Sequence, residues 1–298
     1  MNPSSATRPR ILLLGNRGQV GWELQRTLAP LGEVHGLDYP EIDLANAEVL
    51  EDLVQGCQPQ LIVNAAAYTA VDKAESEPER ARRINAEAPA RLAELACKLG
   101  AWLVHYSTDY VYDGNKQTPY VEEDPPAPLN VYGQTKLEGD QSIQASGCAH
   151  LIFRLCWVYG TRGQNFLRTI LRLAREQETL RVVSDQIGSP TWSRWIAEAT
   201  ALVVQQVLAQ PDPTRFSGLY HLRAAGHTSW HGFASRIVEW MPAAERKCRE
   251  VVAIRTEEYP TPARRPRWSV MSCEKLWRTF RVALPDWETG LRQALDPG

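Results

Sequence analysis

Apolar runs alternate with amphipathic stretches along the first half of the chain. The apolar runs predict β-strands at residues 10–14, 33–37, 61–63, 102–106 and 151–155. The stretches between them repeat apolar positions with a helical period, which predicts helices at residues 20–31, 47–55, 78–99 and 131–145. Repeated strand-helix units predict a parallel sheet with right-handed crossovers.

This alternation becomes less regular after residue 163. Helices are predicted at 165–176 and 195–208 and a strand at 179–183, followed after a Pro-rich break by two further segments at 218–222 and 230–240. An irregular stretch at 113–128, rich in Pro, Asp and Gly, predicts a surface loop of the length that usually carries function. We therefore predict an α/β fold, a Rossmann-type doubly wound parallel sheet with a smaller C-terminal α/β substrate domain. The expected boundaries are 8–158 and 188–213 for the domain that contains the parallel sheet, and 159–187 and 214–298 for the smaller substrate domain.

Composition limits the classes of ligand. The 298 residues are 44% hydrophobic, enough for a large core, and 33 basic against 35 acidic residues leave a formal net charge of −2. This balance gives no global field that would hold nucleic acid or an anionic membrane. We therefore expect neither as a partner, and an anionic ligand must be bound by local groups.

The N-terminal region and the cysteines bear on location and redox chemistry. Residues 1–10 are polar, and the apolar run Ile11–Leu14 is too short for a signal peptide or a membrane span. The six cysteines are scattered without a C-x-x-C pair, and the six histidines show no metal-ligand spacing. We expect a cytoplasmic protein with free thiols and no zinc site.

A glycine-rich turn joins the first predicted strand to the first helix. It runs from Gly15 through Gly18 to Gly21, in the spacing G-x-x-G-x-x-G. Glycines at these positions have two possible roles. They are needed only because the strand-to-helix turn is tight, or they let the backbone approach a pyrophosphate at the helix N-terminus. The position directly after the first strand favours a dinucleotide site.

Two residues near this turn point to opposite cofactors. Asp38, at the end of the second strand, is placed to accept hydrogen bonds from the adenosine ribose of NADH, although it is also compatible with a solvated strand end. Arg17, inside the turn, is suited to the 2′-phosphate of NADPH. We expect use of both cofactors, with a modest preference for NADPH.

Tyr132 and Lys136 lie at i and i+4, on one face of a predicted helix. Reduction of a ketone requires a proton donor for the developing alkoxide, and a nearby ammonium lowers the pKa of a phenol in that role. Such a pair is often only a solvated surface pair. Here, however, it follows the fourth strand, which leads into Thr108, and ligands of open parallel sheets bind beyond the carboxyl ends of the strands. We therefore expect Tyr132, Lys136 and Thr108 to act together.

Ten segments are spread over nearly the whole chain, in the order GNRGQVGWELQRTLAPLG, VNAAAYTAVDKAESEPE, HYSTDYVYDG, PLNVYGQTKLEGD, FRLCWVYG, NFLRTILRLA, DQIGSPT, GLYHL, YPTPARRPRWS and LPDWE. In this order they resemble the extended short-chain dehydrogenases and, within them, the dTDP-4-dehydrorhamnose reductases. The resemblance implies reduction of a nucleotide-bound sugar ketone by NADPH or NADH, the last step in making dTDP-L-rhamnose for cell-surface polysaccharide.

The resemblance also implies roles for single residues. Tyr132 would be the proton donor, and Thr108, Asp109 and Trp157 would contact the sugar nucleotide, although an aromatic at 157 is equally typical of a core. The expected cofactor contacts are Gln19, Val20, Asp43, Leu44, Ala67, Tyr68, Thr69, Tyr106, Tyr132 and Lys136.

A basic segment near the C-terminus is a candidate phosphate clamp. Arg264 and Arg265 either form part of a solvated charge run or bind the pyrophosphate of the substrate, because arginine forks suit phosphate oxygens. We favour a phosphate role for one of the two, and the sequence leaves open which.

Other members of this fold are epimerases, dehydratases or non-catalytic subunits. The related dehydratases typically have an Asp-Glu pair after the threonine, whereas Thr108 is followed here by Asp109 and Tyr110. The missing second carboxylate favours reduction over elimination. The presence of Thr108, Tyr132 and Lys136 argues against a purely regulatory role.

The same resemblance bears on assembly and metal binding. Some relatives are dimers bridged by magnesium through three glutamates, of which Glu23 matches one, whereas Arg194 and Pro297 stand at the other two positions. Because magnesium needs oxygen ligands, we expect no bridging ion. We expect a monomer or homodimer whose activity needs no metal.

Overall fold

A parallel sheet of six strands forms the centre of the computed structural model, which describes residues 8–210 and 213–296. Its strand order is β10-β5-β4-β3-β1-β2, and every neighbouring pair is parallel. The strands are β1 (Arg10–Leu14), β2 (Glu33–Leu37), β3 (Leu61–Asn64), β4 (Trp102–Thr108), β5 (His150–Leu155) and β10 (Gly218–Leu222). In this register Asn64 lies beside His105, at the end of the sheet where the site is expected.

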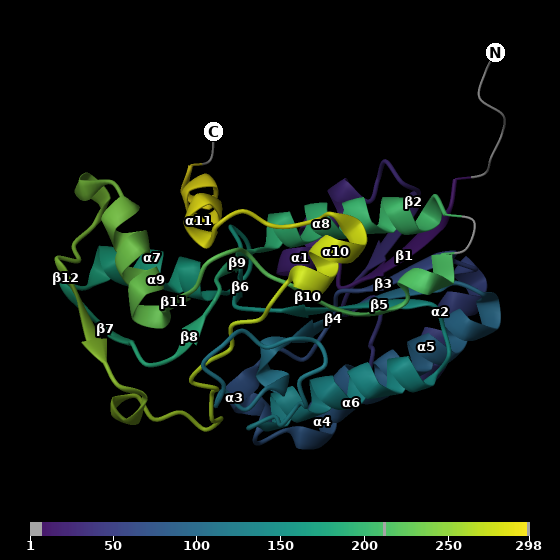
Figure 1. The fold of residues 1–298 in the computed structure, drawn as a ribbon, viewed down its shortest axis with the longest axis horizontal. Helices are drawn as coiled ribbons and strands as arrows, with labels where there is room; N and C mark the ends of the chain where they lie inside the picture. The colour runs from purple at the N-terminus through teal and green to yellow at the C-terminus, as the bar shows by residue number, and fades with distance from the viewer. Residues whose placement is uncertain (1–7, 211–212, 297–298) are drawn as a thin grey trace, which may run out of the picture.

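Helices cover both faces of the sheet (Figure 1). One face packs against α1 (Gln19–Thr27), α8 (Ser193–Leu208) and α10 (Glu274–Phe280). The other packs against α2 (Ala47–Cys57), α5 (Ala88–Leu99) and α6 (Val131–Ala145). The predicted doubly wound fold is therefore confirmed.

The apolar strands are buried on both sides because successive side chains point to opposite faces. In β1, Ile11 and Leu13 join the core beneath α1 and α8, whereas Leu12 and Leu14 join the core beneath α2 and α5. This explains the uninterrupted apolar run Ile11–Leu14 in β1.

A second, smaller core lies beside one end of the sheet, at the left of Figure 1. It is formed by α7 (Phe166–Glu176), α9 (Trp230–Trp240), α11 (Trp287–Leu295) and the parallel pair of β7 (Thr179–Val183) and β12 (Glu250–Ile254). Two short strand pairs lie nearby, β6 (Val158–Tyr159) with β9 (Thr191–Trp192), and β8 (Ile187–Gly188) with β11 (Thr228–Ser229).

The division into two domains stays a prediction. Strand β10 pairs with β5 in the central sheet, and α10 contributes Leu276 and Phe280 to the core beneath that sheet. Both elements belong to residues 214–298, the stretch that we assigned to the substrate domain. The C-terminal segment therefore contributes to both cores.

Two predicted helices differ from those observed. The first ends at Thr27, shortly before Pro30, which has no N–H to continue a helix. The helix expected at 78–99 is α4 (Pro78–Arg82), a π-helical turn η1 (Arg83–Glu87) and α5 in succession. The remaining short elements are α3 (Val71–Ala74), η2 (Asp109–Val111), η3 (Pro213–Phe216), η4 (Ala243–Glu245) and η5 (Thr256–Glu258).

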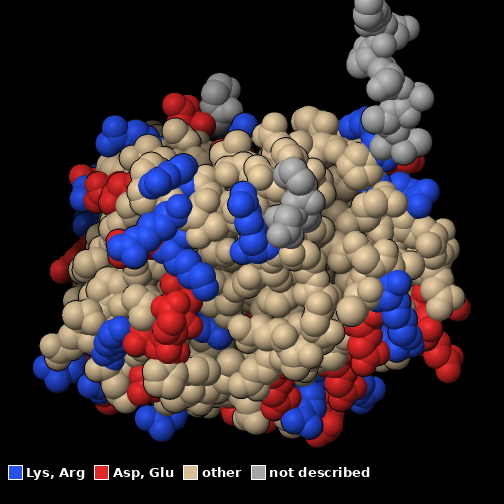
Figure 2. Space-filling model, turned by 45° about the vertical axis from the view of Figure 1, so that its right-hand side comes forward, with Lys and Arg blue, Asp and Glu red and all other residues tan. Residues whose placement is uncertain are grey.

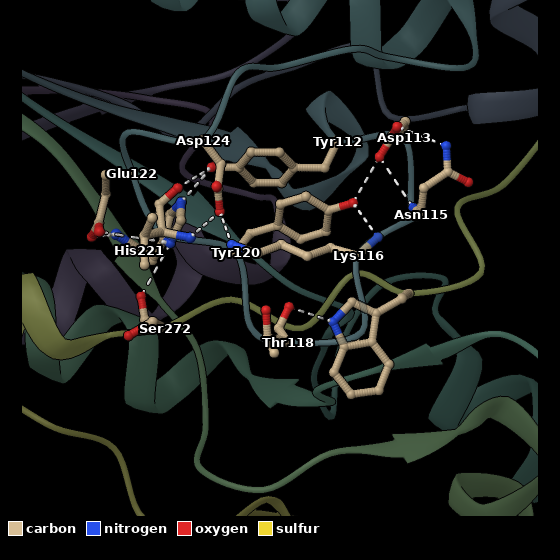
Figure 3. A network of polar contacts seen from close by, with 12 residues as sticks. Tyr112, Asp113, Asn115, Lys116, Thr118, Tyr120, Glu122, Asp124, His221 and Ser272 are labelled. Atoms are coloured by element: carbon tan, nitrogen blue, oxygen red, sulfur yellow. Dashed lines mark hydrogen bonds and ion pairs between the residues drawn. The ribbon is translucent and has the colours of Figure 1, made fainter.

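The irregular stretch at 113–128 is held in place by polar contacts (Figure 3). The Tyr120 hydroxyl donates to Asp113 Oδ1 at 2.8 Å, and the Tyr120 ring stacks on Tyr112 with centroids 4.1 Å apart. The Tyr112 hydroxyl lies 2.8 Å from Nε2 of the buried His221 in β10, whose Nδ1 lies 3.1 Å from the Ser272 carbonyl oxygen. These contacts tie the stretch to the sheet and to the C-terminal segment.

The surface shown in Figure 2 carries basic and acidic side chains beside one another, around a broad area of other residues. Several basic side chains gather at the upper left of this face, with acidic side chains next to them. Among the described residues, no helix is both long enough and apolar enough to cross a membrane.

Candidate active site

A cavity of about 630 Å³ begins at the glycine turn and extends past α6 toward α7 and α9. The expected residues that line it are Gly15, Arg17, Gly18, Gln19, Val20, Asp38, Ala67, Thr69, Tyr106, Thr108, Asp109, Tyr132, Lys136 and Trp157. A smaller cavity of about 290 Å³ shares part of this wall and adds Asp43, Leu44 and Tyr68. The structure thus brings together most of the site predicted from sequence, whereas the stretch 113–128 contributes to neither cavity.

The glycine turn is tightest at Gly15 and Gly21, whereas a Cβ on Gly18 would lie 3.3 Å from the Gly15 carbonyl oxygen. Gly15 has φ +81°, and a Cβ there would lie 2.6 Å from the Ala66 amide nitrogen. A Cβ on Gly21 would lie 1.9 Å from the Gly15 carbonyl oxygen, so Gly21 keeps the turn closed and is not part of the cavity wall. Gly18 caps α1 without a side-chain acceptor, so the first amide groups of this helix are available to an anion.

Asp38, at the end of β2, is hydrogen-bonded to Arg17 in the glycine turn. Asp38 Oδ2 accepts a hydrogen bond from the Arg17 amide nitrogen at 2.9 Å, and Oδ1 accepts one from the Tyr39 amide at 2.7 Å. The Arg17 guanidinium pairs with Glu41. Sequence reasoning missed Glu41, although its place three residues after Asp38 in a turn was a usable signal.

Tyr132 stands in the first turn of α6. Asn130 caps that helix, since its Oδ1 accepts from the Gly133 amide at 2.7 Å. Burial raises the pKa of Tyr132 to about 12, while its hydrogen bond with Thr108 acts in the opposite direction. We expected Lys136 to lower this pKa, but the net direction is upward because burial dominates.

Lys136 is buried and contacts a histidine that the sequence analysis did not identify. Its Nζ lies 3.0 Å from Nε2 of His105, whose Nδ1 lies 3.2 Å from the side-chain nitrogen of Asn64. Burial lowers the pKa of Lys136 to about 8, against the attraction of Asp140, and it holds the pKa of His105 well below its ordinary value. His105 is therefore neutral, and in the tautomer that carries its proton on Nδ1 the Nε2 atom accepts a hydrogen bond from the lysine ammonium.

Asp109 follows Thr108 at the carboxyl end of β4. Its Oδ1 accepts from the Thr108 hydroxyl at 3.2 Å, and its Oδ2 accepts from the Cys156 thiol at 3.2 Å. Burial raises the pKa of Asp109 to about 6, and these hydrogen bonds oppose the increase. Both carboxyl oxygens are thus engaged within the protein at the cavity wall.

Aromatic rings close the far end of the cavity. Trp157 has φ +43° and stacks on Trp230, with centroids 3.5 Å apart and planes 6° apart. Phe166 packs against Trp230 at 4.5 Å, and all three rings line the cavity. Sequence reasoning missed Trp230 and Phe166, because the fold brings them from separate helices.

Neither candidate clamp arginine lines the two cavities. The Arg265 guanidinium forms two hydrogen bonds with Asp72, at 2.7 and 3.0 Å, which hold the pKa of that carboxyl below its usual value. Arg264 is exposed, and its carbonyl oxygen accepts a hydrogen bond from the side-chain Nδ2 of Asn130 at 2.7 Å.

Tyr106 is one of the expected cofactor contacts. Its hydroxyl lies 2.8 Å from Thr200 Oγ1 in α8, so its ring packs under the site.

The residues at the expected magnesium positions do not form a metal site in the part of the chain described. No group of three His, Cys, Asp or Glu side chains there could hold an ion. Arg194 pairs with Glu198 in α8, with Nε and Oε1 3.1 Å apart, and Pro297 lies outside the described residues. Metal independence remains a prediction.

Comparison with known proteins places this site in a family. Residues 9–298 match the family described as RmlD substrate binding domain. The dTDP-4-dehydrorhamnose reductase of Escherichia coli is 48% identical, over 96% of this chain and 97% of the relative.

Solved structures show the same likeness. A dTDP-4-dehydrorhamnose reductase from Clostridium acetobutylicum superposes with a TM-score of 0.89 at 34% identity, covering 97% of this chain and 99% of that one. One from Bacillus anthracis, solved in complex with NADP, gives a TM-score of 0.87 at 34% identity and the same coverage. The chain belongs to the RmlD substrate binding domain family, together with these dTDP-4-dehydrorhamnose reductases.

Proposed function

We propose that this protein reduces the C4 ketone of dTDP-4-dehydro-β-L-rhamnose to dTDP-L-rhamnose, with NADPH or NADH as the hydride donor. The observation that carries the proposal is the meeting of Thr108, Tyr132 and Lys136 in the wall of one cavity that also contains the glycine turn. Relatives named for this reaction match over nearly the whole chain. The working state is a monomer or homodimer in the cytoplasm.

The wall of the cavity fits a dinucleotide. Gly18 and the uncapped N-terminus of α1 present backbone amides to a pyrophosphate, and Asp38 is placed to accept from a ribose hydroxyl. The smaller cavity, lined by Leu44, Tyr68 and Ile84 among others, would hold the adenine. When bound, the reduced nicotinamide supplies the hydride.

Tyr132 supplies the proton in this scheme. Because its pKa is raised to about 12, the phenol keeps its proton at neutral pH and can donate it to the ketone oxygen. The Thr108 hydroxyl, which hydrogen-bonds to Tyr132, orients the same oxygen. Lys136, held by His105, would bind the nicotinamide ribose.

The sugar nucleotide would occupy the remainder of the cavity. Asp109 and Trp157 lie in its wall beyond Tyr132, where they can contact the sugar. A phosphate role for Arg265 would require it to exchange Asp72 for the pyrophosphate, whereas Arg264 is free of such an ion pair among the described residues. Since neither arginine lines the cavity, both stay candidates for the clamp.

The function is tested by offering the purified protein NADPH or NADH with dTDP-4-dehydrorhamnose, and then with the UDP and GDP analogues. Loss of nicotinamide absorbance should occur fastest with the dTDP compound. No loss with any of the three would refute the proposal. Turnover without net consumption of nicotinamide would indicate an epimerase or dehydratase instead.

A further inference from the structure

An exposed ion pair that the proposed function does not use lies beside the adenosine end of the cavity, where Arg17 is part of the wall. After β2, the Ile42 amide donates to the Asp38 carbonyl oxygen at 3.1 Å, which closes a turn. The turn brings Glu41 back over Asp38, with Glu41 Oε2 3.4 Å from the Asp38 amide nitrogen. The other carboxylate oxygen of Glu41 pairs with the guanidinium of Arg17.

Arg17 stands where a cofactor phosphate would be recognised. Its amide donates to the Asp38 carboxylate at 2.9 Å, so its side chain starts beside the group that would accept from the adenosine ribose. In dinucleotide folds, a carboxylate at this position binds the 2′-hydroxyl of NADH, whereas a nearby arginine accommodates the 2′-phosphate of NADPH. Both groups are present here, and the partner of the arginine decides between them.

The charges around this site disfavour binding of the 2′-phosphate of NADPH. Asp38 and Asp43 both line the smaller cavity, and Arg80, the basic residue of its wall, lies 3.7 Å from Glu77. A 2′-phosphate would therefore have to displace Glu41 from Arg17 and remain beside Asp38. The 2′-hydroxyl of NADH needs neither change.

We propose that Glu41 makes NADH the preferred cofactor of this protein, by holding Arg17 away from a 2′-phosphate. The inference rests on the proposed function, since it concerns the dinucleotide that the same cavity would bind. It replaces the modest NADPH preference that Arg17 alone suggested from the sequence.

Binding of the oxidised cofactors tests the proposal without any sugar substrate. Dissociation constants for NAD⁺ and NADP⁺ are measured by calorimetry for the wild type and for Glu41→Gln. The wild type should bind NAD⁺ more tightly. The substitution should shift the affinity ratio toward NADP⁺ by about threefold to tenfold, as expected for one exposed charge near a dianion.

Glu33→Gln is the matched control, because it removes the same charge from the opposite end of β2. It should leave the affinity ratio unchanged. The shift caused by Glu41→Gln should shrink at high salt, since Arg17 and Glu41 are both well exposed. Adding Arg17→Ala to Glu41→Gln should remove most of the shift, because the released guanidinium is what binds the phosphate.

A ratio that stays within about twofold of wild type in Glu41→Gln would overturn the role of Glu41. A shift of equal size in the double variant would also overturn it, because it would reflect general repulsion and not release of Arg17. Failure of the wild type to bind either nucleotide would instead refute the proposed function.

Discussion

At the scale of single residues, the proposed reduction depends most on the phenol of Tyr132. Its burial and its contact with Thr108 suit a group that keeps its proton until the ketone oxygen needs it. Tyr132→Phe should lower turnover by about 10²- to 10⁴-fold, the usual contribution of a general acid. Affinity for the nicotinamide cofactor should stay almost unchanged.

Tyr159→Phe is a suitable control for Tyr132→Phe. The Tyr159 hydroxyl is buried without a hydrogen-bond partner among the described residues, and it does not line the cavity. Its loss should therefore leave turnover near the wild-type value. Near wild-type turnover in Tyr132→Phe, measured by steady-state kinetics, would contradict the assignment of the proton donor.

Lys136 leads to a prediction about pH. Burial lowers its pKa to about 8, so the ammonium form predominates below that pH and is lost above it. If the ammonium binds the nicotinamide ribose, cofactor affinity should fall as the pH rises through about 8. Calorimetry across this range should show the fall in the wild type and a weaker, flatter dependence in Lys136→Met. Identical profiles for the two proteins would contradict the role of Lys136.

The residues predicted correctly as part of the cavity wall lie in contiguous motifs. The glycine turn and the Tyr132–Lys136 pair are examples, since strand-helix connections and helical spacing fix where their members point. His105 could not be assigned in this way, because its contact with Lys136 depends on the register of β4 against β3 and on the packing of α6. Glu41 and Trp230 likewise act through partners that are distant in sequence.

At the scale of secondary structure, the π-helical turn η1 positions one wall of the site. It carries the buried Asn85, whose Oδ1 accepts from the Tyr68 amide at 2.9 Å. The Asn85 Nδ2 donates to the Tyr68 carbonyl at 3.1 Å and to Thr135 Oγ1 at 3.2 Å. The turn thus connects the loop after β3 to α6, the helix that carries Tyr132 and Lys136.

Asn85→Ala should leave these partners without hydrogen bonds. The free energy of unfolding should fall by about 1–3 kcal/mol, the usual cost of unsatisfied buried polar groups. Cofactor affinity should fall as well, because Tyr68 lines the smaller cavity. The exposed Asn115→Ala should change stability by less than about 0.5 kcal/mol. Equal denaturation midpoints for the two variants would contradict this role of η1.

Helices and strands were predicted correctly where the sequence has a strong hydrophobic period. The prediction missed features of the backbone that depend on contacts between distant side chains. The strands of the central sheet follow directly from their apolar runs, because a parallel sheet is buried on both faces. The π-helical turn interrupts a helix whose apolar period continues across it, so the pattern alone could not show it. The placement of β10 beside β5 depends on a long-range return of the chain.

At the scale of the whole molecule, we expect activity and assembly to be independent of divalent metal ions. Tyr132 and Thr108 both line the cavity, where they would face the developing oxyanion of the proposed reaction, and Arg194 pairs with Glu198 within the chain. Turnover and the mass in solution should therefore be unchanged after exhaustive treatment with EDTA. A loss of activity or of a dimer that magnesium restores would contradict this prediction.

The most direct test of the central claim is the stoichiometry of the reaction. One equivalent of NADH or NADPH should be oxidised for each dTDP-L-rhamnose formed from dTDP-4-dehydrorhamnose, with product and nicotinamide measured in the same reaction. Product formed without net oxidation of nicotinamide, or no product from the intact protein, would contradict the account.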